Sequence, residues 1–407
     1  MIILCCYIHR KGSRVRASRA SHSVKFVARP NVSVIGQEDG LKDDDGYDKV
    51  EFRPAEVRKI IGRRSIKVDK KEQVNSLPHV SKREVPRSSF IVTGKIGSGN
   101  FGEVSLGVLY GLDGSHSETM VAIKSIKGDK DSDFNDFLQE IKVMSYIKPD
   151  LNLVSMIASC STNENQTREL WLILEYCGKG DLKDFLLKNK KLILCGDDSQ
   201  SINDRCLLHW VFDIAKGMEH LSSNNIMHGD LAVRNILLAE NPMKNGRLVA
   251  KVADFGLSKR FYTNAKYEKE NRLLVPWKWM ALELLTHDFL TLTSDVWSFG
   301  IVTWEIFSFG RVPYGQVEMN EVIAQLEDGY RLPCPTDITN ATMWSPERLY
   351  RNIAEMCFTE DPDYRANFTD VIKIIKKELT EKEISTNEIM QSRYQSNCGD
   401  HYLQLGK

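Results

Sequence analysis

The chain has 407 residues, and its 55 basic and 55 acidic side chains give a formal net charge of zero at pH 7. This length allows one large domain or two smaller ones, together with tails. The balanced charge gives no general attraction to nucleic acid, so nucleic acid is not expected as a partner. The nine cysteines are scattered without a C-x-x-C pair. The sequence therefore supports neither a zinc site nor a disulfide framework, and it indicates a reducing compartment.

Residues 1–9 are mostly apolar and lead directly into basic residues. A membrane-spanning helix needs about 17–25 residues, so this stretch cannot cross a bilayer alone. Its basic residues follow the apolar part, which argues against a signal peptide. We interpret it as the cytoplasmic end of a truncated transmembrane helix. Acylation of Cys5 and Cys6 at a membrane surface, or a disordered start, are the alternatives.

Residues 10–86 are polar and weakly patterned, and seven basic residues between Arg10 and Arg29 precede the first acid, Glu38. Such a composition is typical of a disordered linker, here a juxtamembrane segment if residues 1–9 end a membrane helix. The basic block is either a solvated tail or a contact for anionic membrane lipid.

Patterned sequence begins near residue 89. Runs of β-branched and apolar residues predict strands at 89–95, 102–109, 120–126, 154–160 and 170–176. Helical spacing at 134–147 places Phe137, Ile141, Met144 and Ser145 on one side. Further helices are predicted at 207–221, 294–307, 349–358 and 368–379. The helix at 294–307 is apolar but short and contains Asp295 and Glu305, which favours a buried core helix over a membrane span.

The order of these elements predicts an α+β fold with a small strand-rich N-lobe and a larger, mostly helical C-lobe. The boundaries fall at 87–177 for the N-lobe and 178–381 for the C-lobe, with a loose polar tail at 382–407.

A glycine-rich loop lies between the first two predicted strands, and it reads Gly97-Ser98-Gly99-Asn100-Phe101-Gly102-Glu103-Val104. Glycines allow backbone N–H groups to approach phosphate oxygens closely. A dinucleotide-binding loop would open a helix, whereas this one is followed by a strand pattern. No Gly-Lys-Ser/Thr follows, so a P-loop is excluded.

A lysine follows at the end of the third predicted strand, in Val121-Ala122-Ile123-Lys124. From this position its ammonium can reach a cleft and hold nucleotide phosphates. A buried ammonium needs a carboxylate partner, because an unpaired buried charge is costly. Glu140, on the helix at 134–147, is the best candidate.

The most informative stretch is His228-Gly229-Asp230-Leu231-Ala232-Val233-Arg234-Asn235. Its acid and amide suit phosphoryl transfer, with Asp230 accepting a hydroxyl proton and Asn235 offering an oxygen to Mg²⁺. Asp254-Phe255-Gly256 follows; Asp254 is the second metal ligand, while Phe255 and Gly256 let that segment pack and turn.

Together these motifs resemble the protein kinase catalytic domain, specifically the receptor tyrosine kinase group, over about residues 85–380. Ala232 stands where serine/threonine kinases usually have lysine, and Arg234 matches the receptor-type tyrosine kinases. The stretches 150–154 and 175–177 look closest to the platelet-derived, fibroblast and vascular endothelial growth factor receptors.

The resemblance implies roles for further residues. Nucleotide contacts fall on the glycine loop (97–102), Val104, Ala122 and Lys124, and on Leu174, Glu175 and Cys177 of the hinge between the lobes. Residues 275–283 are similar to the shelf that supports a peptide substrate. Structural roles are implied for Asp295 on the central helix and for Arg365, which would pair with Glu283.

Tyr267, with Tyr262 as a second candidate, falls where receptor kinases are autophosphorylated. Gly229 replaces the arginine that normally pairs with that phosphate. We therefore expect activation to depend less on loop phosphorylation, or to use Lys259 or Arg260 instead.

The resemblance thus implies a protein-tyrosine kinase that uses MgATP, with Mn²⁺ as an alternative metal, to phosphorylate tyrosines of protein substrates. It implies a homodimer for trans-phosphorylation and a location on the cytoplasmic face of the plasma membrane, with a cytoplasmic location as the alternative. A weakly catalytic pseudokinase scaffold and a non-receptor cytoplasmic tyrosine kinase are the alternatives.

Overall fold

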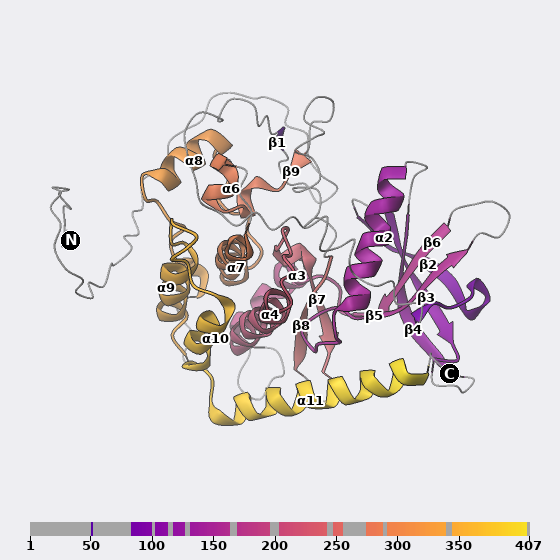
Figure 1. Cartoon of the computed structure of the whole chain (residues 1–407). Helices are drawn as coiled ribbons and strands as arrows, with labels where there is room; N and C mark the ends of the chain where they lie inside the picture. Colours follow the sequence, from indigo (N-terminus) through magenta and orange to yellow (C-terminus); the bar gives the residue numbers. More distant parts are fainter. Residues whose placement is uncertain are drawn as a thin grey trace.

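The computed structural model describes residues 50–51, 83–99, 102–112, 117–126, 131–162, 169–195, 203–241, 247–254, 274–287, 291–338 and 344–404. These residues form the α+β, two-lobed architecture expected from the sequence (Figure 1). A strand-rich N-lobe lies beside a larger C-lobe made mostly of helices.

The N-lobe is built on a five-stranded antiparallel sheet in the order β2-β3-β4-β6-β5. Its strands are β2 (Phe90–Gly99), β3 (Gly102–Tyr110), β4 (Glu118–Ile126), β5 (Met156–Thr162) and β6 (Glu169–Glu175). Side chains alternate between the two faces of a strand. Val121 and Ile123 of β4 accordingly join Phe90 and Ile173 in an apolar cluster of their own.

Helix α2 (Asp131–Tyr146) contributes Phe137, Ile141 and Met144 to the main core that continues into the C-lobe. These residues are the apolar positions predicted from helical spacing, and all of them are buried. The β4 residues Ala122 and Lys124 are buried as well, in alternation with Val121 and Ile123. As its sequence pattern predicted, β4 therefore packs one face into the apolar cluster, while its other face carries Ala122 and Lys124 of the candidate site.

The C-lobe packs around α7 (Leu292–Phe307), which is buried along nearly its whole length. Thr291 and Ser294 form a capping box that satisfies backbone groups at its start. The interpretation of this segment as a core helix is confirmed. Around it lie α3 (Leu182–Cys195), α4 (Arg205–Ser223), α6 (Leu282–His287), α8 (Met319–Glu327), α9 (Pro346–Cys357) and α10 (Phe368–Lys376).

Two small sheets complete the C-lobe. Strands β7 (Ile236–Glu240) and β8 (Leu248–Val252) form an antiparallel hairpin that carries the site loops. Strand β1 (Val50–Glu51) pairs with β9 (Leu274–Val275). Single 3-10 turns occur at η3 (Arg87–Ser89), η5 (Val233–Asn235), η8 (Trp277–Trp279) and η9 (Thr336–Ile338).

Parts of the expected linker contact the folded domain. Besides β1, Val85 is buried, and its N–H donates to the carbonyl of Ser159 in β5 at 2.9 Å. The segment just before residue 87 therefore belongs to the edge of the N-lobe sheet. In the C-lobe, the helix α3 continues as far as Cys195.

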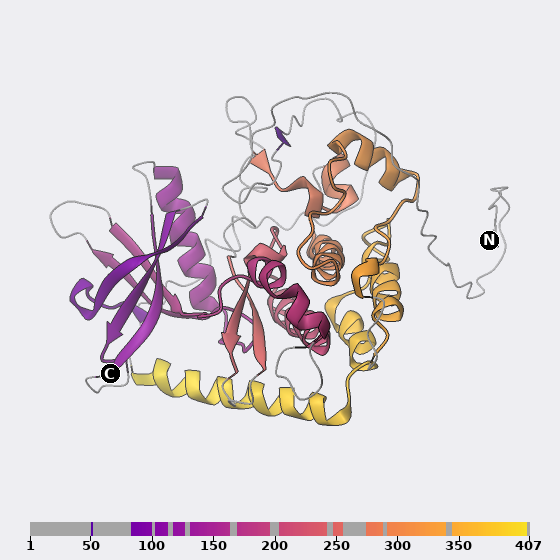
Figure 2. The same cartoon turned by 180° about the vertical axis from the view of Figure 1, so that it is seen from behind.

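The largest difference from expectation is at the C-terminal end. Residues 382–407 were expected to form a loose tail, but Glu381–Gln404 form the helix α11. In both views α11 runs beneath the two lobes, from α10 to the N-lobe (Figures 1 and 2). The expectation was wrong because α11 is mostly polar and is stabilised by contacts with residues distant in sequence, among them Asp150 and Arg205.

Within the residues that the structure describes, no helix combines the length and apolar character needed to cross a bilayer. Residues 1–9, including Cys5 and Cys6, and the basic block at 10–29 lie outside the described residues.

Candidate active site

A buried lysine links the two lobes at the centre of the molecule. The Nζ of Lys124 on β4 lies 2.7 Å from Oε1 of Glu140 on α2. The same ammonium lies 3.1 Å from Oδ1 of Asp254, which follows β8 in the C-lobe. The structure therefore brings together three residues that the sequence separates widely, and it holds the N-lobe sheet, α2 and the C-lobe in one polar cluster.

Electrostatics keep this lysine charged. Burial alone would lower the pKa of Lys124, but the charges of Asp254 and Glu140 more than offset it and raise the pKa above its ordinary value. Burial also raises the pKa of Glu140, while Lys124 opposes that change. Because the ammonium faces two carboxylates, we take Lys124 as the charged member. A fixed cation at this position suits the phosphates of a nucleotide.

The second part of the site is the loop before β7. Arg234 forms an ion pair with Oδ1 of Asp230, and its guanidinium also stacks on the ring of Trp279 at 4.6 Å. The Nδ2 of Asn235 donates to Oδ2 of Asp230 at 2.9 Å and to its backbone carbonyl at 2.7 Å. Burial raises the pKa of Asp230, and Arg234 opposes this shift. Both oxygens of the predicted base are therefore held in fixed positions.

The central helix α7 holds the loop before β7 in place through Asp295. The backbone N–H groups of His228 and Gly229 donate to the carboxylate of Asp295 at 2.7 and 2.9 Å. Gly229 has φ = 76°, a conformation that side chains with a Cβ disfavour. The residue that departs from the family pattern thus fits the backbone at its position.

Asn235 and Asp254 are brought together by the β7–β8 hairpin. The N–H of Ala253 donates to the carbonyl of Asn235 at 2.9 Å, which fixes Asp254 beside the loop before β7. Asp254 itself has φ = 58°. An amide and a carboxylate are hard oxygen donors that suit Mg²⁺, an ion that keeps several waters and phosphate ligands. Among the described residues, no group of three His, Cys, Asp or Glu side chains is arranged to hold a metal ion.

The glycine-rich loop is the turn between β2 and β3, where Gly99 is paired with Gly102. A Cβ on Gly102 would lie 1.8 Å from the carbonyl oxygen of Ser125 in β4. This glycine is therefore required by close strand contact as well as by any approach of phosphate. Asn100 and Phe101, at the tip, lie outside the described residues.

The hinge follows β6. Leu174 packs against an apolar cluster made of Val154, Cys177 and Ala239, and Leu237 of β7 joins it from the C-lobe. Leu237 was not among the predicted nucleotide contacts. Its signal was available, because it lies two positions after Asn235 in a strand that alternates between the two faces. Burial raises the pKa of the Cys177 thiol to about 12, with a smaller effect of Glu175.

Glu175 has a role that its sequence position did not reveal. Its carboxylate accepts hydrogen bonds from the Ser155 N–H at 2.6 Å, from Lys251 Nζ at 3.0 Å and from the Tyr394 hydroxyl at 2.9 Å. Lys251 and Tyr394 were not predicted as site residues. No local pattern marks them, because their partners lie in another lobe or another helix.

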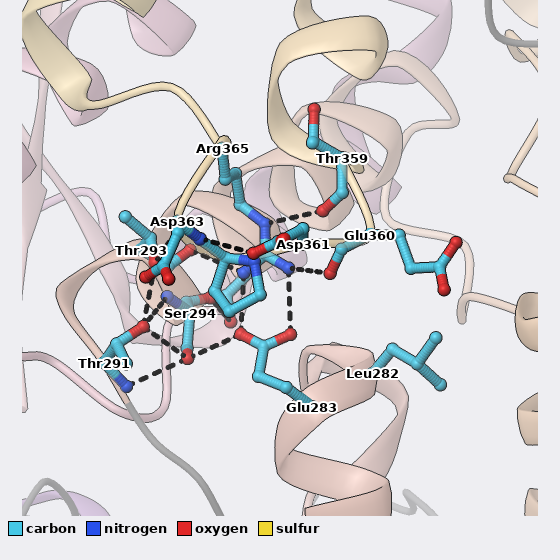
Figure 3. A network of polar contacts seen from close by, with 12 residues as sticks. Leu282, Glu283, Thr291, Thr293, Ser294, Thr359, Glu360, Asp361, Asp363 and Arg365 are labelled. Atoms are coloured by element: carbon cyan, nitrogen blue, oxygen red, sulfur yellow. Dashed lines mark hydrogen bonds and ion pairs between the residues drawn. The ribbon is translucent and has the colours of Figure 1, made fainter. Parts of the chain in front are cut away.

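The expected ion pair of the C-lobe is present (Figure 3). Arg365 donates to both oxygens of Glu283, at 2.7 and 2.8 Å, and Ser294 adds a bond of 2.9 Å to the same carboxylate. Arg365 also reaches the backbone carbonyls of Thr359 and Thr293. The pair fixes α6, and with it the end of the segment that leads from Asp254, onto α7.

A small pocket adjoins this segment. Its lining includes Asp230 together with Pro276, Met280, Ala281 and Leu284. This places the predicted peptide shelf directly beside the predicted base. Phe255, Gly256, Tyr262 and Tyr267, together with Lys259 and Arg260, lie outside the described residues.

Comparison with known proteins agrees with this geometry. Residues 90–375 match the family described as "Protein tyrosine and serine/threonine kinase". The chain is 31% identical to a fibroblast growth factor receptor of Halocynthia roretzi, with 73% of this chain and 39% of the relative covered. Fibroblast growth factor receptor 1 of Xenopus laevis is 32% identical, with 77% and 37% covered. The tyrosine kinase receptor Cad96Ca of Drosophila melanogaster is 33% identical, with 73% and 36% covered. The match spans about two fifths of the length of these relatives.

Proposed function

Because the chain belongs to the family of protein tyrosine and serine/threonine kinases, we propose that it transfers the γ-phosphate of MgATP to tyrosine hydroxyls of protein substrates. The observation that carries this proposal is the position of Lys124 between Glu140 and Asp254, opposite Asp230 with Arg234 and Asn235 around it. A cation for phosphates, oxygen donors for a metal and a base for a hydroxyl thus converge from both lobes.

Each side chain has a defined part in this reaction. Asp230 accepts the proton of the tyrosine hydroxyl and orients its oxygen toward the γ-phosphorus. Arg234 and Asn235 hold the Asp230 carboxylate in place. Lys124, fixed by Glu140, binds phosphate oxygens, while Asn235 and Asp254 would hold Mg²⁺. The bound ion would neutralise charge that develops on the transferred group, so catalysis rests mainly on positioning and electrostatics.

The choice of tyrosine as substrate is supported by Ala232 and Arg234 and by the name of one relative, the tyrosine kinase receptor Cad96Ca. The relatives are named as receptors. We place the chain in the kinase part of a receptor on the cytoplasmic side of the plasma membrane. On this proposal it works as a homodimer, has Tyr267 or Tyr262 as autophosphorylation sites and holds its basic block near anionic lipid.

The test is phosphotyrosine formation on an acidic tyrosine-containing polymer by the full chain, with ATP and Mg²⁺. We expect turnover of about 1–100 s⁻¹. Asp230→Asn should lower kcat by at least about a thousandfold, because the hydroxyl loses its base and its orientation. Asp328→Asn, at an exposed position after α8, is the matched control and should retain parental turnover. Nucleotide binding without phosphotyrosine in the parent chain would instead support a pseudokinase.

A further inference from the structure

The C-terminal helix α11 is fastened to the C-lobe along its first half. Arg205 of α4 forms two hydrogen bonds with the carboxylate of Glu383, at 2.6 and 2.7 Å. Farther along, Met390 is fully buried against Leu151 and Val249. The side chain of Gln391 donates to Asp150 at 2.6 Å and accepts from the N–H of Leu151 at 3.0 Å. These contacts fix the orientation of α11, so that its later residues reach the junction of the two lobes.

At that junction, Tyr394 of α11 enters the polar network behind the hinge. Its ring lies under the ammonium of Lys251, 4.2 Å from ring centre to Nζ. Its hydroxyl donates to Oε1 of Glu175 at 2.9 Å and lies 2.8 Å from Oγ of Ser155. The same Glu175 oxygen accepts from Lys251 and from the Ser155 backbone. One carboxylate oxygen therefore joins α11, β8 and the segment before β5.

Glu175 is the last residue of β6, and the next residues form the hinge that was expected from the sequence to contact the nucleotide. Lys251 belongs to the C-lobe strand β8, so the Glu175–Lys251 pair already connects the two lobes. Tyr394 adds a neutral donor to a carboxylate, a hydrogen bond that is stronger than one between neutral groups. Its removal would leave Glu175 with fewer restraints at the point where the lobes pivot.

We propose that Tyr394 is a positioning residue for nucleotide binding: its hydroxyl fixes Glu175, and through Glu175 it restrains the hinge and the opening of the lobes. This inference rests on the proposed function. Lobe opening releases nucleotide, and in many enzymes product release limits turnover. Loosening the hinge should therefore hasten departure of nucleotide without slowing the chemical step.

The character of α11 makes this restraint reversible. Apart from Ile389, which is 45% exposed, its outward side chains are polar, and within its described part the fully buried apolar anchor is Met390. In proteins, most of the stability of a helix comes from tertiary packing, so α11 depends on docking for its stability. Segments with few buried apolar contacts open at low free-energy cost. Tyr394 can thus engage and leave the network while the rest of the C-lobe stays folded.

The decisive variant is Tyr394→Phe in the full chain, which removes the hydroxyl and retains the ring beside Lys251. Tyr364→Phe is the matched control, because Tyr364 is 83% exposed. Dissociation of a fluorescent ADP analogue with Mg²⁺ is followed by stopped flow, and KM for ATP and kcat are measured on the same samples. Hydrogen exchange of 381–396 reports whether α11 stays docked.

For Tyr394→Phe we expect ADP dissociation to be about three- to tenfold faster and KM for ATP to rise by a similar factor. This factor corresponds to part of the free energy of one charge-assisted hydrogen bond, transmitted to the nucleotide site. The kcat should not fall, and Tyr364→Phe should match the parent. A purely structural role would lower kcat through loss of folded protein and leave KM unchanged. Unchanged ADP dissociation in Tyr394→Phe overturns the proposal, whether or not α11 remains docked.

A double-mutant cycle tests the route through Glu175. In a Glu175→Gln background the charged acceptor is gone, so Tyr394→Phe should change ADP dissociation by much less than in the parent. An equal factor in both backgrounds would show that Tyr394 does not act through Glu175. Because ADP release is measured without phosphoryl transfer, a parent chain that binds ADP but forms no phosphotyrosine contradicts the proposed function alone.

Discussion

A single buried residue of α7 influences the electrostatics of the loop at 228–235, which contains Asp230. Glu305 of α7 accepts hydrogen bonds from Trp279 Nε1 at 2.7 Å and from the Val233 N–H at 3.2 Å. Both reach the same oxygen, and the other, Oε1, is buried with no hydrogen bond to the described part of the chain. Burial raises the pKa of Glu305 from 4.5 to about 7, and the bond from Trp279 only partly opposes it. The folded protein therefore holds a proton here that the unfolded chain has lost.

The pH dependence of stability follows from this shift. Between the unfolded pKa and about 7 the folded state binds more protons, so stability falls as pH rises through this window and levels off above it. From pH 5.5 to 7.5 we expect Glu305 to account for a loss of about 2 kcal/mol in the free energy of unfolding. Glu305→Gln should lack this loss when both proteins are unfolded chemically at each pH. Parallel pH profiles would contradict the assignment.

At the scale of elements, the joint between α6 and α7 depends on a buried ion pair. The Arg365 side chain is fully buried, and that of Glu283 nearly so. Removing one partner of such a pair leaves an uncompensated charge in the interior, which costs far more than the net value of the pair. The exposed pair of Arg351 and Glu347 on α9 offers a contrast within the same lobe.

Arg365→Met should therefore lower the free energy of unfolding by about 3–5 kcal/mol. Adding Glu283→Gln should restore part of this loss, because the stranded charge is then removed. Arg351→Met, the control, should change stability by less than about 1 kcal/mol, since water screens the exposed pair. Urea unfolding of the four proteins checks the order, and a loss in Arg365→Met no larger than in the control would refute it.

For the whole molecule, the sequence predicted the parts whose pattern is local. The motif around Lys124, the helical spacing of α2 and the apolar run of α7 each carry their own signal, and the two-lobed architecture followed from their order. The residues Lys251 and Tyr394 were missed. Their positions depend on strand pairing and helix docking across the molecule, and no pattern in their neighbourhood shows this. Helix α11 was missed because most of its contacts with the lobes are polar, and the few apolar residues such as Met390 form no clear helical pattern in the sequence.

This docking also predicts how stability is distributed. Met390→Ala should free α11 while α7 stays protected, because Met390 buries the main apolar contact of one peripheral helix. In native-state hydrogen exchange, protection of 381–396 should drop at least about tenfold, from loss of about 2 kcal/mol of buried contact. Amides of α7 should exchange as in the parent. Equal loss of protection in both helices would mean that α11 is part of the global folding unit.

The thiol of Cys177 decides how the hinge responds to reactive small molecules. With a pKa of about 12, it is almost entirely protonated at neutral pH, and only on the order of one molecule in a hundred thousand carries the nucleophilic thiolate. An acrylamide inhibitor bound at the nucleotide site would therefore react slowly with the Cys177 thiol, although this residue belongs to the hinge. Among the cysteines whose burial the structure describes, Cys195 at the end of α3 is the exposed one, and its thiol is accessible to a maleimide dye.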